Sequence, residues 1–243
     1  MKFSIITVTY NDLSNLKITL ESVKKQNFHD YEYIVIDGGS NDGTIEYFEQ
    51  ISNNDCHLKF FSEPDKGIYD AMNKGASKAL GDYIIFLGAA DTFYSDNILA
   101  EVDNILNKID VDVLYGKVIF SSGEKKGNIF GGKVNFYGTL LDKYVAHQSV
   151  FAKRQLLIRF PFDLNYTFLA DQDFMLNVKD KKYKMKYINK VISLYDGMGF
   201  SSDSDSRINI LNERIKLLKK HNRFIYYIRQ TGHFIKTREY YDI

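Results

Sequence analysis

The sequence predicts an α/β fold with a mostly parallel central sheet, and three observations support this prediction. Short apolar runs rich in β-branched residues alternate with segments of helical periodicity through the first half of the chain. Strands and helices that alternate at this length are typical of βαβ units, whose strands run parallel. Polar clusters follow the apolar runs, at the edge where parallel sheets bind ligands. The length of 243 residues suits one large domain or a domain with a tail.

Four strands and four helices are expected in the first half. The first strand is expected at residues 3–8, and apolar residues then recur at helical spacing from Leu13 to Val23, with Asp12 in the N-cap position. The other strands are expected at residues 33–36, 58–61 and 83–87. The other helices are expected at residues 41–51, 66–80 and 95–107.

The second half is less regular and predicts a small antiparallel excursion followed by mixed elements. Strands are expected at residues 113–120, 128–134, 145–151 and 185–194. A helix is expected at residues 171–178, and a loop rich in Gly, Ser and Asp at residues 196–206. From Arg207 the chain is basic and aromatic, and we expect it to be helical.

Composition excludes several classes of protein. The formal net charge is only +1, so no overall charge favours nucleic-acid binding. The single cysteine, Cys56, excludes a disulfide within the chain and fits a reducing cytosol. The apolar opening is too short for a signal peptide, and no segment approaches the roughly 18 apolar residues of a membrane-spanning helix. We therefore expect a cytoplasmic protein that is not integral to a membrane.

Polar side chains lie just beyond the ends of the expected parallel strands. They are Tyr10, Asp37, residues 63–66 and Asp91. Because the carboxyl ends of parallel strands meet at one edge of the sheet, these groups should converge. This predicts a binding site without naming its chemistry.

Two carboxylates at this edge each have two interpretations. Asp37 begins a glycine-rich turn and could accept the N3–H of uracil, or it could simply stabilise the turn. Asp91 could bind Mg²⁺ or Mn²⁺ together with phosphate oxygens, or it could cap the following helix. The residue types alone do not decide between these interpretations.

The second half adds three candidate residues. One of Asp171 and Asp173 could be a general base, with the other a helix N-terminal anion, or both could be caps. His147 is expected mid-strand, where a lone histidine is most often a core residue, and no second His at metal spacing supports a zinc site. Neither a dinucleotide-binding glycine motif nor a P-loop is present.

Several stretches, taken together, resemble the inverting glycosyltransferases of family 2, which have the GT-A fold. They are residues 5–11, 35–44, 62–75 and 81–91, in the order and spacing of the family's donor-binding half. The likeness weakens after Phe93 and returns at residues 114–116, 147–149 and 170–174. The stretch at residues 63–75 is similar to bacterial surface-polysaccharide transferases of the colanic acid, capsule or O-antigen type.

The resemblance implies roles for the residues that match. The nucleotide base and ribose would be held by Thr9, Tyr10 and Asp37, and Lys66 would lie near the diphosphate. Asp91 would be the ligand of a divalent cation, Mn²⁺ or Mg²⁺, although Ala90 replaces the first of the family's two adjacent aspartates. The general base would be Asp171, with Asp173 as a structural neighbour.

The implied function is metal-dependent, inverting transfer of a sugar from a nucleotide-diphosphate donor, a UDP-sugar, to a saccharide or lipid-linked saccharide in bacterial surface-polysaccharide synthesis. Residues 1–206 would form the transferase domain, with a donor half at 1–92 and an acceptor half at 93–206, followed by a basic aromatic tail at 207–243. The tail could bind the inner face of the cell membrane, or it could pack on the core. The alternatives are a sugar nucleotidyltransferase and a sugar-nucleotide-binding module with weakened activity.

Overall fold

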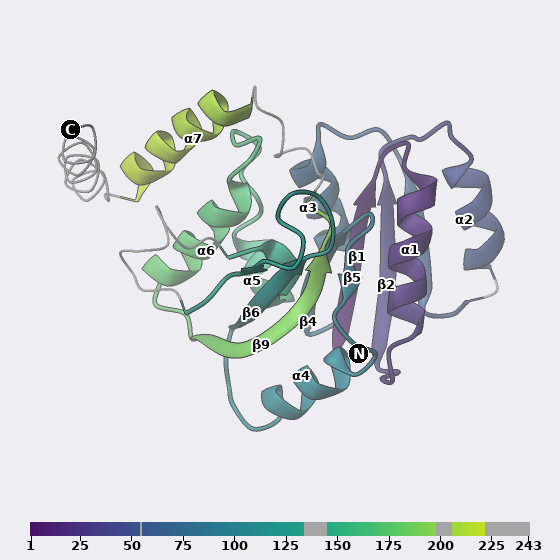
Figure 1. The fold of residues 1–243 in the computed structure, drawn as a ribbon, viewed down its shortest axis with the longest axis horizontal. Helices are drawn as coiled ribbons and strands as arrows, with labels where there is room; N and C mark the ends of the chain where they lie inside the picture. Colours follow the sequence, from purple (N-terminus) through teal and green to yellow (C-terminus); the bar gives the residue numbers. More distant parts are fainter. Residues whose placement is uncertain (54, 134–144, 198–205, 222–243) are drawn as a thin grey trace.

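The computed structural model describes residues 1–53, 55–133, 145–197 and 206–221. Within these ranges the strands form one sheet with helices on both faces (Figure 1). The N-terminal half, in purple and blue, and the C-terminal half, in green, lie beside each other along the sheet in Figure 1. The predicted α/β fold with a mostly parallel sheet is confirmed.

The parallel strands of the N-terminal half end at the same level. They are β1 (Phe3–Thr9), β2 (Tyr31–Asp37), β3 (Leu58–Ser62) and β4 (Tyr83–Gly88), in the order β3-β2-β1-β4. In their register Thr9 lies opposite Asp37, and Asp37 lies opposite Ser62. The loops that follow these strands therefore emerge side by side along one edge, as the sequence predicts.

The sheet continues with strands from the C-terminal half. β8 (Val150–Lys153) is antiparallel to β4 and to β6 (Val113–Phe120), and β9 (Met185–Tyr195) is parallel to β6. The short strands β5 (Thr92–Phe93) and β7 (Ile129–Phe130) pair antiparallel with β9 and β6. Because β5 follows β4 closely in sequence but pairs with β9, the sheet curls. The predicted antiparallel excursion is present.

Alternate strand residues fill two cores, one on each face of the sheet. The face with Phe3 and Ile5 is covered by α1 (Leu13–Lys24), α2 (Thr44–Ser52) and α4 (Ile98–Leu106). The face with Ile6 and Val8 is covered by α3 (Ile68–Lys78), α5 (Arg154–Arg159), α6 (Ala170–Asp180) and α7 (Ser206–Lys220). Burial on both faces explains why the parallel strands read as continuous apolar runs.

The strand expected at residues 145–151 is wrong in its first part. His147–Ser149 form a 3₁₀ helix, and β8 begins only at Val150. Ser149 closes this turn, because its N–H and its hydroxyl both donate to the carbonyl oxygen of Ala146 at 2.9 Å. Such local bonds compete with sheet pairing, so His147 is not in mid-strand.

Other differences concern short elements and helix ends. β5 and α5 were not expected, because two and six residues are too few to show periodicity. The strand expected at 128–134 is described only as β7, and residue 134 lies outside the described residues. Asp12 does not cap α1 within the described part of the chain; the N–H of Leu13 donates instead to Asp42 Oδ2 at 2.9 Å.

The expected C-terminal helix is present and packs on the body of the protein. Leu217 and Leu218 on α7 are each 1% exposed and belong to the core beside α6. The remainder of the expected tail, residues 222–243, lies outside the described residues. Nowhere in the described ranges does a helix reach the length and apolarity that crossing a bilayer requires.

Candidate active site

A cavity of about 670 Å³ lies at the carboxyl edge of the parallel strands. Its walls come from the residues after β1 and β4, from the β3–α3 loop with the first turn of α3, and from the loop before α6. Three of the predicted site residues line it: Thr9, Tyr10 and Lys66. Three others lie outside its lining: Asp37, Asp91 and Asp171.

Two buried hydroxyls in the lining of this cavity lack hydrogen-bond partners. They are Thr9 Oγ1 and Tyr166 OH, in residues only 8% and 2% exposed. Among the described residues, no other buried side-chain nitrogen or oxygen atom lacks a partner. An unsatisfied buried polar group costs about 1–3 kcal/mol, and because solvent does not reach either oxygen, a ligand in the cavity would bond to them only after a local rearrangement.

An exposed aromatic ring and a free cation accompany these hydroxyls. Tyr10 is 63% exposed directly after β1. The ammonium group of Lys66 has no ion-pair partner within the described part of the chain. Asp70, also in the lining, accepts the N–H of Lys66 at 3.0 Å and lies 3.6 Å from the ammonium of Lys74. The cavity thus offers a flat apolar surface and one ammonium group, beside the carboxylates of Asp12, Asp65 and Asp70.

Asp37 is fully buried at the end of β2 and fixes the turn that follows. Its carboxylate accepts the N–H groups of Gly39 and Ser40 at 3.0 and 2.9 Å. It also accepts the hydroxyls of Ser40 and of Ser62, the latter at 2.6 Å. Four donors thus occupy both carboxylate oxygens. The structure does not bring Asp37 to the cavity.

Asp91 is 2% exposed and joins three segments of the chain. Its Oδ2 accepts the N–H of Gly88 at 2.8 Å and the side-chain amide of Gln148 at 3.0 Å, and its Oδ1 accepts the N–H of Asp196 at 3.0 Å. Burial raises the pKa of the Asp91 carboxyl, and the N–H of Asp196 and the charge of His147 offset only part of this effect. Asp91 therefore holds the end of β4 against the end of β9.

These contacts also test whether Asp91 fits a divalent cation. Mg²⁺ and Mn²⁺ need carboxylate oxygens with free lone pairs in a site that solvent or phosphate can reach. Both oxygens of Asp91 already accept N–H groups, and Ala90 beside it has no carboxylate. Within the ranges the structure describes, no group of three or more His, Cys, Asp or Glu side chains could hold a metal. The residues present do not fit the ion in this arrangement.

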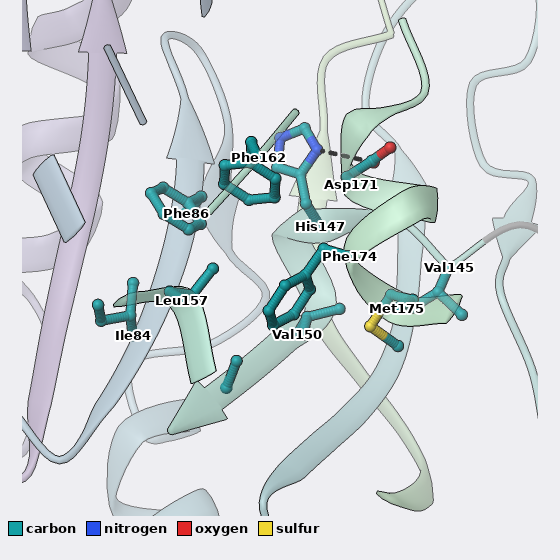
Figure 2. Close-up of a pocket in the computed structure, with 11 residues that line it drawn as sticks. Ile84, Phe86, Val145, His147, Val150, Leu157, Phe162, Asp171, Phe174 and Met175 are labelled. Carbon is teal, nitrogen blue, oxygen red and sulfur yellow. Dashed lines mark hydrogen bonds and ion pairs between the residues drawn. The ribbon is translucent and has the colours of Figure 1, made fainter. Parts of the chain in front are cut away.

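Asp171 lies in the first turn of α6 and faces His147 (Figure 2). His147 Nδ1 is 3.4 Å from Asp171 Oδ2, and the N–H of Gln172 donates to Asp171 Oδ1 at 2.8 Å. The two side chains border a second, apolar cavity of about 20 Å³, roughly enough for one water molecule. Figure 2 shows the aromatic rings of Phe86, Phe162 and Phe174 around it.

Tyr69 connects Asp171 to the larger cavity. It lines that cavity, and its hydroxyl donates to the carbonyl oxygen of Phe168 at 2.9 Å and lies 3.4 Å from Asp171 Oδ1. Asp171 is 4% exposed and is therefore one side chain away from the cavity. Catalytic hydrogen bonds are often long before substrate binds, so a carboxylate at this position can serve as a general base.

The loop before α6, which forms one cavity wall, is held by α7. The Glu213 carboxylate accepts three successive N–H groups, those of residues 167, 168 and 169, at 2.5, 2.9 and 3.1 Å. Lys216 donates to the carbonyl oxygen of Asn165 at 3.1 Å, and its ammonium lies 4.9 Å from the ring centroid of Tyr166. A carboxylate bound by consecutive N–H groups is a strong anchor for the loop.

Asp173 anchors the end of α7 to α6. It is 1% exposed, and Lys220 Nζ and His221 Nε2 lie 2.8 and 3.0 Å from its two oxygens. Burial alone would raise the pKa of Asp173, but the bonds from His221 and Lys220 outweigh burial and hold this pKa below its usual range. The predicted role as a structural neighbour of Asp171 agrees with these contacts.

Three residues that line the larger cavity, Asp65, Tyr69 and Tyr166, were given no role from the sequence, although residues 63–66 were expected at this edge. The first two lie in residues 62–75, a stretch that was singled out as a whole, so its residues could have been examined one by one. Tyr166 gives no sequence signal, because neither burial nor the lack of a partner can be read from residue type.

Comparison with known proteins places this geometry in a family. The profile of glycosyl transferase family 2 matches residues 4–162. A PGL/p-HBAD biosynthesis glycosyltransferase of Mycobacterium tuberculosis is 32% identical over 206 residues, which cover 83% of this chain and 79% of that protein.

Two solved structures share the fold. Residues 1–349 of S. aureus TarS, in complex with UDP, match with a TM-score of 0.65 and 21% identity, covering 80% of this chain and 60% of the TarS chain. The mannosyltransferase PcManGT of Pyrobaculum calidifontis, with GDP-Man and Mn²⁺, matches with a TM-score of 0.69 and 18% identity over 91% of this chain and 64% of its own. This chain therefore spans less than two thirds of either solved chain. Because the profile covers more than half of its length and a relative is 32% identical, the chain belongs to glycosyl transferase family 2 and is a glycosyltransferase of the GT-A fold.

Proposed function

We propose that the larger cavity binds a nucleotide-diphosphate sugar, with UDP as the nucleotide, and that the protein transfers the sugar to a hydroxyl group with inversion. The observation that carries this proposal is that an exposed aromatic ring, that of Tyr10, and the ammonium group of Lys66 belong to one cavity at the carboxyl edge of the parallel strands. A nucleobase would stack on the ring, and a diphosphate would meet the ammonium group. The nucleotides in TarS and PcManGT support a donor of this class.

The proposed donor contacts are Thr9, Tyr10 and Lys66. The exposed ring of Tyr10 offers a stacking surface for the nucleobase, and the Thr9 hydroxyl lies next to it in the chain. The ammonium of Lys66 would face the diphosphate, whose negative charge grows as the bond to the sugar breaks. Asp37, which was expected to share this role, acts on the turn that borders the site.

We assign the general base to Asp171. As the acceptor oxygen bonds to the anomeric carbon, its proton passes to the Asp171 carboxylate. The bond from that carbon to the diphosphate oxygen breaks, and its electron pair leaves with the nucleoside diphosphate. Attack opposite the leaving group inverts the configuration. The contacts to His147 and Tyr69 would fix the carboxylate for this step.

The cation remains a separate prediction. The Mn²⁺ ion of PcManGT supports Mn²⁺ or Mg²⁺ in this fold, whereas the contacts of Asp91 do not leave it free to bind one. In the proposed transfer Asp91 therefore keeps its contacts with the protein and binds no metal. Donor binding measured with Mn²⁺, with Mg²⁺ and with EDTA will decide whether a cation takes part.

We further propose a saccharide or lipid-linked saccharide acceptor, in the synthesis of a bacterial surface polysaccharide such as capsule, O-antigen or colanic acid. The mycobacterial relative, named for PGL/p-HBAD biosynthesis, supports a biosynthetic role for the transfer. Basic residues on α7, among them Arg214 and Lys219, would favour contact with the inner face of the membrane from the cytoplasm. Flotation of the protein with anionic and neutral liposomes tests this contact.

The test of the proposed reaction is Asp171→Asn. With a panel of UDP-sugars and saccharide acceptors, we expect the variant to lose roughly 10²- to 10⁴-fold in transfer rate, because general-base catalysis contributes about this much. UDP affinity, measured by calorimetry, should be unchanged. The matched control is Asp96→Asn, which alters an exposed carboxylate outside both cavity linings and should keep full activity.

Other outcomes separate the alternatives. If Asp171→Asn keeps nearly full transfer activity, Asp171 is not the general base. The proposed binding of the donor would be unaffected by that result. UDP binding without transfer or donor hydrolysis under any metal condition would favour the binding module with weakened activity. The family match leaves no support for the sugar nucleotidyltransferase alternative.

A further inference from the structure

The glycine at position 38 leaves room for the side chain of Asp65 beside the end of β2. A Cβ atom on Gly38 would lie 2.8 Å from Asp65 Oδ2 and 3.3 Å from Cδ2 of Tyr10. The first distance is shorter than any ordinary contact, so a larger residue at position 38 would displace the carboxylate. The Asp65 carboxylate and the Tyr10 ring therefore converge on the same point of the cavity wall.

One oxygen of Asp65 remains available for a ligand. Its Oδ1 accepts the N–H of Gly67 at 2.8 Å, which fixes the side chain. No donor in the described part of the chain reaches Oδ2, although Asp65 is half-buried and lines the larger cavity. The unpartnered hydroxyl of Thr9 lies in the same lining. A fixed acceptor and a flat ring thus lie close together.

This group of side chains has the chemistry that distinguishes nucleobases. Uracil carries a proton on N3, and guanine carries one on N1 beside an exocyclic amine, so both donate to a carboxylate. Cytosine and adenine present a lone pair at the corresponding ring nitrogen, which a carboxylate repels. Asp37 cannot make this distinction, because four protein donors occupy its oxygens.

We propose that Asp65 is the specificity-determining residue for the nucleobase, accepting the ring N–H of uracil or guanine on Oδ2 while the base stacks on Tyr10. The inference rests on the proposed function, since it assumes that a nucleotide occupies this cavity. It assigns base selection to a carboxylate after β3, in place of the Asp37 expected from the sequence. Gly38 contributes to base selection because it leaves the space that Oδ2 of Asp65 occupies.

The experiment measures binding of UDP, GDP, CDP and ADP to the full chain by calorimetry. We expect UDP or GDP to bind roughly 10- to 100-fold more tightly than CDP and ADP, which is the range for a hydrogen bond to a charged group. In Asp65→Asn the amide oxygen can still accept the N–H of Gly67, so the loop keeps its shape. The affinity of Asp65→Asn for the preferred nucleotide should fall by a similar factor. The affinity for CDP should stay the same or rise, because the side-chain amide of the variant can donate a hydrogen bond to N3 of cytosine.

Two further variants test whether the position of the Asp65 carboxylate determines the selectivity. Gly38→Ala leaves Asp65 in the chain but pushes its carboxylate away, so it should reduce the same selectivity. Asp70→Asn removes a second carboxylate of the lining and should leave the ratio of UDP to CDP affinity unchanged. Uracil and guanine are told apart by which diphosphate binds more tightly.

The outcomes distinguish this inference from the function on which it rests. If nucleotides bind selectively but Asp65→Asn keeps the wild-type ratio of UDP to CDP affinity, the role of Asp65 is overturned and the proposed function stands. If no nucleoside diphosphate binds the wild-type chain, both are overturned. A melting curve for each variant shows whether the fold is intact.

Discussion

The carboxyl edge of the parallel strands and the loop before α6 both form walls of one cavity, yet they are held in different ways. At the strand edge, Asp37 accepts hydrogen bonds from residues that are 2, 3 and 25 positions away in the sequence. At the other wall, Glu213 and Asp173 bind groups that are 44 to 48 positions away. The first wall is assembled by consecutive βα units, whereas the second depends on α7.

This difference bears on where function is vulnerable. The wall that would hold the donor follows from a local pattern of strands and turns. The helix that carries Asp171 begins directly after the loop that Glu213 anchors, so the position of the assigned base depends on α7. The region expected to be a basic aromatic tail thus supports the loop before α6. The following predictions test that dependence, beginning with the largest expected effect.

Truncating a buried side chain on α7 should destabilise the whole domain. Leu217 is 1% exposed in the core shared with α6, and Leu→Ala changes at such sites cost about 2–5 kcal/mol. We expect Leu217→Ala to lower the free energy of unfolding by this amount in urea denaturation. Transfer activity should fall at temperatures where the variant is only partly folded.

The matched control lies on the same helix. Leu211 is 45% exposed, so Leu211→Ala should change the free energy of unfolding by less than about 1 kcal/mol. Equal and small effects of both variants would mean that α7 behaves as an independent tail. The division of the chain at residue 206 would then hold in energetic as well as in sequence terms.

The parallel part of the fold could be predicted because burial on both faces leaves a continuous apolar run in the sequence, as at residues 3–8. The C-terminal half could not be predicted to the same depth. A 3₁₀ turn at His147–Ser149 stands where a strand was expected, because Ser149 bonds to the carbonyl oxygen of Ala146. The strand β5 exists through its pairing with β9. The turn depends on a local side-chain bond and β5 on a distant partner strand, and periodicity within a short window reports neither.

The site shows the same limit. Topology predicts that Asp37, residues 63–66 and Asp91 all lie near the strand ends, and they do. Which carboxylate stays accessible depends on nearby donors: Ser40 and Ser62 occupy Asp37, whereas Oδ2 of Asp65 meets none among the described residues. That outcome depends on side-chain positions to within an ångström, and residue types do not supply them.

The anchor between α6 and α7 should weaken in acid. Because the pKa of Asp173 is lowered in the folded protein, the unfolded chain binds a proton more readily there. Its stabilising contribution is thus present above the unfolded pKa of about 3.9 and is lost as pH falls through the lower folded value. We expect Asp173→Asn to be less stable than wild type by about 1–2 kcal/mol at pH 7, after allowing for the partly exposed Lys220. The difference in the free energy of unfolding between Asp173→Asn and wild type should decrease below about pH 4.

The comparison with an exposed carboxylate isolates the effect. The pKa of Asp110 is also lowered, by Lys184 and Lys153, but its side chain is 70% exposed, so solvent screens the pairs. Asp110→Asn should therefore differ less from wild type at every pH. Unfolding in urea at several pH values measures both differences. A gap for Asp173→Asn that stays constant from pH 7 to pH 3 would contradict the assigned anchor.

The smallest expected effect lies in the turn from β4 to β5, where Ala89 lines the cavity. Ala90 has φ of +71°, in the left-handed region, which costs an L-residue about 1–2 kcal/mol. Glycine avoids this cost but loses roughly 0.5–1 kcal/mol more chain entropy on folding. We therefore expect Ala90→Gly to raise the free energy of unfolding by about 0.5–1 kcal/mol in urea, whereas Ala89→Gly, without positive φ, should lower it. A loss of stability in both variants would show that the strain at Ala90 is already relieved by the bonds that Asp91 accepts from Gly88 and Asp196.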